Sequence, residues 1–241
     1  MSARHRPGEH TMSRRVFRAS VAGLLIGGLL ACGGGGGGDP GPVMSVDGTG
    51  ASTFDSASLA GQLATYPLAQ LSGAEADSLV FMRQEEQLAH DVYAVSATLW
   101  TPPVFANITA SEATHSAAVK ALLDRYQLTD PLAGLPNGSF KAPAFQALYD
   151  TLVLASRVSA VEAVKVGLQI EELDIRDIEA QKAVVDNDDI LRVYDQLLRG
   201  SRNHLRAYWQ ALLQQGGSYV PQYISQEQFD AILATPRETG R

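Results

Sequence analysis

The chain has 241 residues, a formal net charge of −7 and a single cysteine. This acidity argues against a nucleic-acid partner, and one cysteine excludes an internal disulfide. The length is more than one buried core needs, so we expect one folded domain together with segments for targeting or linkage.

The stretch MSRRVFRASVAGLLIGGLLAC, residues 12–32, joins a basic region to a short apolar run. The apolar run is about half the ~20 residues that span a bilayer, so it predicts an export signal over residues 1–31. The final LLAC resembles a lipobox, which makes Cys32 the expected lipidation site; a chance cysteine at a secretory cleavage site is the alternative. Arg14 and Arg15 resemble a twin-arginine motif, with an ordinary basic region as the alternative.

Six glycines follow Cys32, and the sequence DPGPVMSVDGTGASTFDS comes next. We expect residues 32–54 to form a flexible tether. The domain would then be held on the periplasmic face of a bacterial membrane by its lipid anchor. Residues 1–31 contain five Arg and one Glu, so the rest carries 14 basic and 25 acidic residues. Charge alone would therefore not attract it to anionic lipid.

Residues 55–241 predict one nearly all-helical domain, because long stretches rich in Ala, Leu, Glu and Gln repeat with a 3.6-residue period. Long helices are expected over 73–99, 103–126, 160–184 and 188–215, and short ones over 143–155 and 226–234. Ser72 with Glu75, and Ser159 with Glu162, are helix-start signals. Only the link over 127–158 is long. The pattern is that of an all-α, ferritin-like four-helix bundle, two hairpins joined by a long crossover, plus a short C-terminal helix.

The core-facing stripe of each long helix is interrupted near its middle by an acid or a histidine. The interrupting residues are Glu86, Glu112, His115, Glu172 and His204. A buried, unpaired carboxylate is very costly, so these groups need a common partner. One or two divalent cations would supply it, since glutamate and imidazole are both metal ligands. Glu112 and His115 have the i, i+3 spacing found in di-iron bundles.

The register of the helix over 160–184 stays open. A second, more apolar stripe carries Glu171 in place of Glu172, and Glu179 is a further candidate ligand. A faint internal repeat favours Glu172, because residues 85–93 resemble residues 171–179 at an offset of 86. The same ambiguity attaches to Glu85 and Glu86.

Glu112 has an alternative role as well. It would belong to a capping box with Thr109 if the second long helix began late. Pro103, which suits a first helical turn, favours an earlier start.

The segments QEEQLAHDVY, SEATH, EELDIRDIE and GSRNHLRAYW resemble the domain of unknown function 2202 family. More broadly, the chain resembles the ferritin-like superfamily of di-iron proteins. The resemblance covers about residues 75–233 and implies a metal site with Tyr93 beside its ligands. In rubrerythrin-like members the fourth long helix repeats the Glu-x-x-His pattern, whereas this chain has Ser201 in place of that glutamate, three residues before His204.

The resulting expectation is an exported protein with two metal ions, iron first and manganese or zinc as alternatives. Its chemistry would be of the oxidase or peroxidase type, and no catalytic residue is assigned. The alternative is a non-catalytic bundle with a structural or partner-binding role; a cage-forming storage ferritin is a weaker third option. The expected partner is a membrane through the lipid anchor. A homodimer, the redox partner and enzymatic activity itself stay open.

Overall fold

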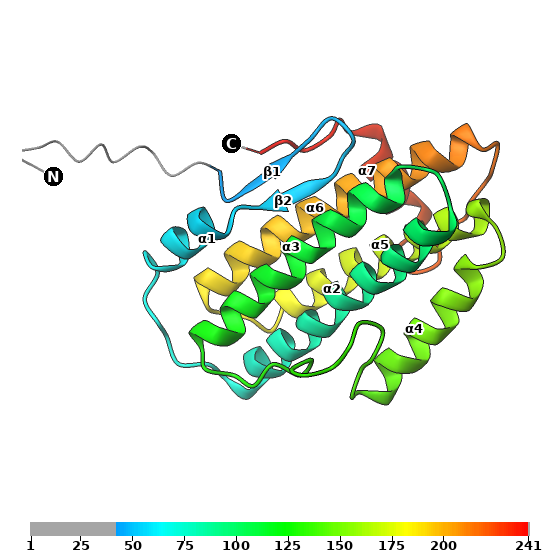
Figure 1. Cartoon of the computed structure of the whole chain (residues 1–241). Coiled ribbons are helices and arrows are strands. Elements are labelled where there is room, and N and C mark those ends of the chain that lie inside the picture. Colours follow the sequence, from blue (N-terminus) through cyan, green and yellow to red (C-terminus); the bar gives the residue numbers. More distant parts are fainter. Residues whose placement is uncertain (1–41, 241) are drawn as a thin grey trace, which may run out of the picture. The chain divides into compact units, whose positions relative to one another are not determined.

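The computed structural model describes residues 42–240. The predicted export signal, the lipidation site at Cys32 and the first part of the tether lie outside these residues. The described chain is dominated by four long helices, α2 (Gly73–Leu99), α3 (Val104–Arg125), α5 (Ala160–Lys182) and α6 (Asp188–Gln214). α2 packs against α3 and α5 against α6, while α2–α5 and α3–α6 contacts close the bundle (Figure 1). The prediction of an all-α helical bundle is confirmed, with each long-helix boundary within two residues of its expected place.

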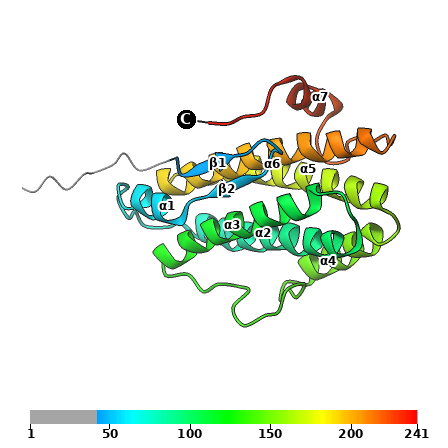
Figure 2. The same ribbon diagram turned by 45° about the horizontal axis from the view of Figure 1, so that its top comes forward.

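The shorter helices lie on the outside of this bundle. α4 (Pro143–Ser156) belongs to the long crossover and contacts α2 and α5, and α7 (Gln226–Ala234) follows α6. Figure 2 shows α4 on the α2 side and α7 on the α6 side. None of the helices within residues 42–240 is both long and apolar enough to cross a membrane.

The structure corrects the predicted end of the tether. Strands β1 (Met44–Val46) and β2 (Ser52–Phe54) form an antiparallel hairpin, and α1 (Ser56–Leu63) follows it. The turn is closed by the carboxylate of Asp47, which accepts the backbone amides of Thr49 and Ala51. Strands of three residues are too short to show an alternating pattern in the sequence, which is why the hairpin was not expected.

Two predicted helix starts are present with their hydrogen bonds. Ser72 and Glu75 form a reciprocal capping box at the start of α2, and the Ser159 hydroxyl accepts the Glu162 amide at the start of α5. The second carboxylate oxygen of Glu75 accepts the amides of Asp186 and Asn187 in the α5–α6 link. These bonds satisfy backbone amides at the helix ends and help to fix where α2 and α5 begin.

The register of α5 follows the more apolar of its two stripes. The core-facing residues are Val164, Leu168, Glu171, Ile175 and Ile178, all of them fully buried. Glu179 lies outside this stripe and is exposed. The expected stripes of α2, α3 and α6 are buried almost throughout.

Candidate metal centre

Each long helix contributes side chains to one polar cluster at the middle of the bundle. Glu86 comes from α2, Glu112 and His115 from α3, Glu171 from α5 and His204 from α6. All five side chains are buried. Because the remaining residues of the core stripes are mostly apolar, the cluster is enclosed by hydrocarbon above and below.

The position of Glu112 settles the capping alternative. α3 begins at Val104, so Glu112 lies about two turns inside the helix rather than at its end. The Thr109 hydroxyl donates to the carbonyl of Phe105 and does not cap the helix. Glu112 is therefore an interior residue whose side chain faces the core.

Glu112 lies between the two histidines and contacts both. Its Oε2 is 2.9 Å from Nδ1 of His115, and its Oε1 is 2.8 Å from Nδ1 of His204. A second carboxylate stands beside each ring: Glu86 Oε2 is 3.3 Å from His115 Nδ1, and Glu171 Oε2 is 3.5 Å from His204 Nδ1. The arrangement is nearly symmetric about Glu112, with one histidine and one outer glutamate on either side.

These contacts are short but do not have hydrogen-bond geometry. Both oxygens of Glu112 and of Glu86, together with both Nδ1 atoms, are buried without a hydrogen-bond partner. Buried polar atoms are normally paired, and leaving them unpaired costs free energy. The donor atoms of Glu112, His115 and His204 instead lie within 4.8 Å of one another, as atoms around a shared cation do.

The charges in the cluster are strongly coupled. Burial by itself would lower the pKa of both histidines, but Glu112 outweighs it and raises the pKa of His115 to about 10 and of His204 to about 9. Burial raises the pKa of Glu86 to about 7 and of Glu171 to about 6, in each case against the attraction of a histidine. For Glu112, the two histidines outweigh burial and hold the pKa well below its usual range. The cluster therefore retains positive charge at its nitrogens.

Tyr93 lies beside the cluster. Its hydroxyl is 2.7 Å from Oε1 of Glu171 and donates to it. This bond occupies one oxygen of Glu171 and leaves Oε2 directed at His204. Burial and then the charge of Glu171 raise the pKa of Tyr93 well above its ordinary value, so the phenol stays protonated.

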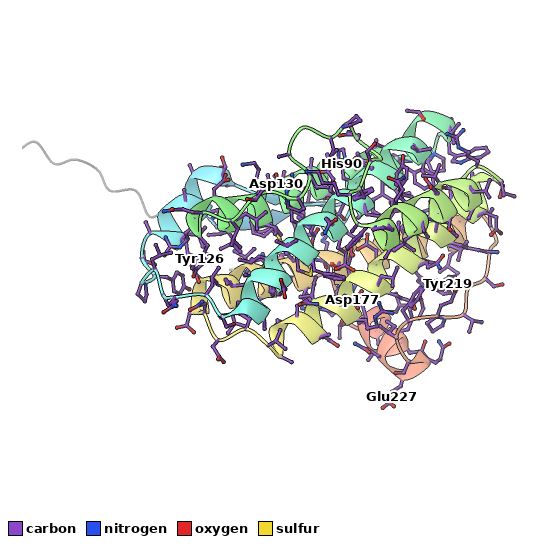
Figure 3. The ribbon with its side chains drawn as sticks, turned by 90° about the horizontal axis from the view of Figure 1, so that it is seen from below. His90, Tyr126, Asp130, Asp177, Tyr219 and Glu227 are labelled. Atoms are coloured by element: carbon purple, nitrogen blue, oxygen red, sulfur yellow. The ribbon has the colours of Figure 1, made fainter. Side chains whose placement is uncertain are left out.

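The structure does not bring Glu172 or Glu179 to the cluster. Oε2 of Glu172 accepts the backbone amides of residues 222–224 in the segment before α7, at 2.7, 2.7 and 3.3 Å. Tyr219, labelled in Figure 3, belongs to the same segment, and burial together with Glu172 raises its pKa. Glu179 contacts Gln228 of α7 at the surface. Among the candidates on α5, Glu171 is thus the one beside the histidines, because the more apolar stripe faces the core.

Ser201 does not extend toward the cluster. Its hydroxyl donates to the carbonyl of Leu197, one turn back on α6. No carboxylate of α6 is needed beside His204, because Glu112 of α3 contacts both rings.

Two further buried acids were not among the predicted ligands. Asp174 is 1% exposed and neither of its carboxylate oxygens has a hydrogen-bond partner; burial, then Glu85 and Glu171, raise its pKa well above the usual range. Burial and then Asp177, which is labelled on α5 in Figure 3, do the same for Glu85. Asp174 follows Glu171 by one turn, and this i, i+3 spacing was the signal in the sequence.

A serine from outside the bundle completes the surroundings of the histidines. Ser52 of β2 contacts the Nε2 atom of both rings, at 2.8 and 2.9 Å. Because residues 32–54 read as a tether, no sequence pattern pointed to it.

The chain was compared with known families, proteins and structures. The sequence model of a family described as "Uncharacterized protein domain (DUF2202)" matches residues 75–236. The uncharacterized protein MJ0754 of Methanocaldococcus jannaschii is 43% identical over 178 residues, which is 74% of this chain and 96% of the relative. The crystal structure of MJ0754, described as a hypothetical protein of Methanococcus jannaschii, is similar with a TM-score of 0.70 and 44% identity, covering 71% of this chain and 98% of that one. The chain therefore belongs to the DUF2202 family.

Proposed function

We propose that the protein binds two divalent metal ions, iron in the first place, in the core of its helical bundle. The observation that supports this proposal is the convergence of unpartnered, buried ligand atoms: Nδ1 of both histidines and the oxygens of Glu112 and Glu86. A cation among these atoms removes the cost of burying them unpaired.

The donor set fits such a centre. Carboxylates and imidazoles together suit iron, manganese and zinc, and the absence of thiolates among these residues disfavours softer metals. Glu86, Glu112, Glu171 and the nearby Asp174 would carry four negative charges when ionised, which two divalent cations balance.

The position of each residue suggests its role. Glu112 offers one oxygen to the side of each histidine and would bridge the two ions. Glu86 with His115, and Glu171 with His204, would each hold one ion. Tyr93 would fix the orientation of Glu171 by donating to its other oxygen. Bound iron would supply the electrons for reducing oxygen or peroxide, as in ferritin-like di-iron proteins, and the burial of the cluster would keep bulk water away.

A purely structural polar network is the competing explanation. Such a network stabilises a core only when its members are hydrogen-bonded to one another. The short contacts of Glu112 with the two Nδ1 atoms lack that geometry. This difference is what favours the metal centre.

The cellular setting is part of the same proposal. Cys32 would carry the lipid that holds the exported protein at the periplasmic face of the membrane. Mass spectrometry of the membrane-extracted protein tests this directly: a mature chain that begins with an acylated Cys32 supports it, and an unmodified N-terminus at another residue contradicts it.

The metal proposal is tested by loading the purified protein with Fe(II) without oxygen, removing free iron and measuring metal and protein. We expect about two iron ions per chain. Glu112→Gln should lower this number to one or none, because its neutral amide cannot bridge two cations. Glu75→Gln is the matched control, since Glu75 is another buried glutamate whose oxygens already accept backbone amides. A wild-type protein without stoichiometric iron, or a Glu112→Gln variant that keeps both ions, contradicts the proposal.

A further inference from the structure

The β1–β2 hairpin lies beside α3 and α6 (Figure 1), and its strand β2 contacts both helices. Two hydrogen bonds attach β2 to α3: the amide of Ser52 donates to the Ser111 hydroxyl at 2.9 Å, and the amide of Phe54 donates to the Thr114 hydroxyl at 3.1 Å. Ser52 and Phe54 are buried, while Thr53 between them is exposed. The strand therefore presents Ser52 and Phe54 to the bundle.

Ser52 is fully buried, and its hydroxyl lies between the two imidazoles. Oγ is 2.8 Å from Nε2 of His115 and 2.9 Å from Nε2 of His204. The two rings are stacked, with centroids 5.2 Å apart and planes 14° from parallel. Phe54 also contacts the His115 ring edge-to-face, with ring centroids 5.5 Å apart, and helps to restrain it. One hydroxyl thus contacts both histidines on the edge opposite to Glu112.

The space for this contact is provided by Gly200 on α6. A Cβ atom at residue 200 would lie 2.5 Å from Cε1 of His115 and 3.0 Å from the Ser52 hydroxyl. Any side chain larger than hydrogen would displace the ring or the serine. The hairpin therefore packs closely against α3 and α6 around the Ser52 hydroxyl.

The chemistry of the hydroxyl restricts the proton positions. A neutral imidazole carries one proton, on either Nδ1 or Nε2, and only the other nitrogen has a free lone pair. For Nδ1 of each ring to act as a ligand, each ring must carry its proton on Nε2. A serine oxygen has two lone pairs, so it can accept both of these N–H groups at once. A hydrogen-bond partner on the nitrogen that does not bind metal is the usual means of orienting a ligating histidine.

We propose that Ser52 is the positioning residue of this centre: its hydroxyl accepts the Nε2–H groups of both histidines and thereby aims both Nδ1 atoms at Glu112. The role of Nδ1 as a metal ligand rests on the proposed function, whereas the contact of the Ser52 hydroxyl with both Nε2 atoms does not. Ser52 lies outside residues 75–236, the part matched by the family model. The N-terminal segment of this chain is therefore a component of the site and not merely a linker.

The proton positions are measured by long-range ¹H–¹⁵N NMR of the imidazoles, in the metal-free protein and after addition of Zn²⁺. In the wild-type protein we expect a proton on Nε2 of both His115 and His204 in both states, with Nδ1 changing its shift when Zn²⁺ binds. An unprotonated Nε2 on either ring overturns the inference.

Variants separate the role of the hydroxyl from packing. Ser52→Ala should lower Zn²⁺ affinity about 10- to 100-fold, as other losses of such a partner do, and should speed the exchange of both Nε2 protons. Ser52→Thr, which keeps the hydroxyl, should restore most of the affinity. Ser201→Ala is the matched control, because it removes a buried hydroxyl that bonds only its own helix.

The outcomes distinguish this inference from the proposed function. If Zn²⁺ binds the wild-type protein and Ser52→Ala leaves the affinity and the imidazole spectrum unchanged, the role of Ser52 is refuted and the metal site stands. If no metal binds, while both Nε2 protons of the wild-type protein exchange slowly and Ser52→Ala speeds their exchange, the metal site is refuted and the hydrogen-bonding role of Ser52 stands.

Discussion

Glu171 and Glu172 are adjacent buried glutamates with different surroundings, and their exchange for glutamine tests the geometry most economically. Glu171 contacts His204 and accepts from Tyr93, while Glu172 accepts three backbone amides near α7. Glu171→Gln should remove the stabilisation that one of the two proposed ions provides, because that ion loses a ligand beside His204. Glu172→Gln should leave it intact and weaken the fold in both states.

The expected magnitudes follow from these contacts. One ion at about 100 times its dissociation constant stabilises the folded state by about 2.7 kcal/mol. For a domain of this size that is a rise of about 5–10 °C in Tm. The pKa of Glu171 is raised from 4.5 to about 6, so burial makes its ionised form costly in the folded state. At 1.36 kcal/mol per unit, glutamine should therefore stabilise the metal-free protein by up to about 2 kcal/mol at pH 7. Losing the charge of Glu172 should cost about 1–3 kcal/mol, because its amide bonds are weakened but not removed.

Thermal unfolding of the wild-type protein and both variants, followed by circular dichroism with and without Zn²⁺, gives all six Tm values. The reasoning predicts the same metal-dependent rise in Tm for the wild-type protein and for Glu172→Gln, and a smaller rise for Glu171→Gln. The reverse pattern, in which Glu172→Gln alone loses the rise, would show that α5 is turned by one residue and would refute the geometry.

Three further predictions concern the same cluster. Zn²⁺ affinity should increase as the pH rises from about 6 to 9, because the ion must displace protons from histidines whose pKa values are about 10 and 9. Calorimetry in buffers of different ionisation enthalpy measures the protons released. A pH-independent affinity would be inconsistent with ligation at Nδ1. Gly200→Ala should lower the free energy of unfolding by about 1–3 kcal/mol, because the added methyl group overpacks against His115 despite the better helix propensity of alanine. Urea unfolding measures this free energy, and a gain in stability would argue against the close packing. Tyr93→Phe should weaken Zn²⁺ binding about 10-fold while the fold is kept, since Glu171 loses the donor that orients it. Unchanged affinity in a competition titration would contradict a role of Tyr93 in orienting Glu171.

The stability of the metal-free protein should also depend on pH in a defined direction. The raised pKa of His115 contributes stability that is complete below about pH 6.5 and is lost as the pH approaches 10. The lowered pKa of Glu112 contributes stability that is present above its ordinary pKa of 4.5 and is lost as the pH falls. Urea unfolding of the metal-free protein between pH 4 and 9 should therefore show a maximum on the acidic side of neutrality. A steady rise of stability through pH 9 would contradict this.

The helices could be predicted from the sequence because their local signals agree with the tertiary structure. Ser72 with Glu75 and Ser159 with Glu162 mark starts that the structure keeps. The stripes of α3 and α6 each have one clear apolar phase, and on α2 only the choice between Glu85 and Glu86 stays open. These stripes predict that Glu86, Glu112, His115 and His204 face the core, and all four side chains are buried.

The choice on α5 could not be made reliably from one sequence. Glu171 and Glu172 are neighbours, and a change of one residue turns a helix by only about 100°. The internal repeat favoured Glu172, whereas the apolar stripe favoured Glu171, and burial of the apolar residues decided the register. The apolar stripe involves residues along the whole helix, whereas the internal repeat rests on a few polar residues.

Ser52 was beyond sequence reasoning for a different reason. The hairpin is stabilised by contacts with α3 and α6, which are distant in the sequence, and its strands have three residues each. Glycine-rich surroundings gave it the composition of a linker. Only the fold shows that this segment reaches the histidines.

The central claim is that the atoms around Glu112 hold two metal ions. Anomalous X-ray diffraction from crystals of the Fe(II)-loaded protein, measured at the iron edge, tests it most directly. The geometry predicts two anomalous peaks within the cluster, one beside Nδ1 of His115 and one beside Nδ1 of His204, with Glu112 between them. A protein without iron at this position, or iron bound through Nε2 on the Ser52 side, would contradict the claim.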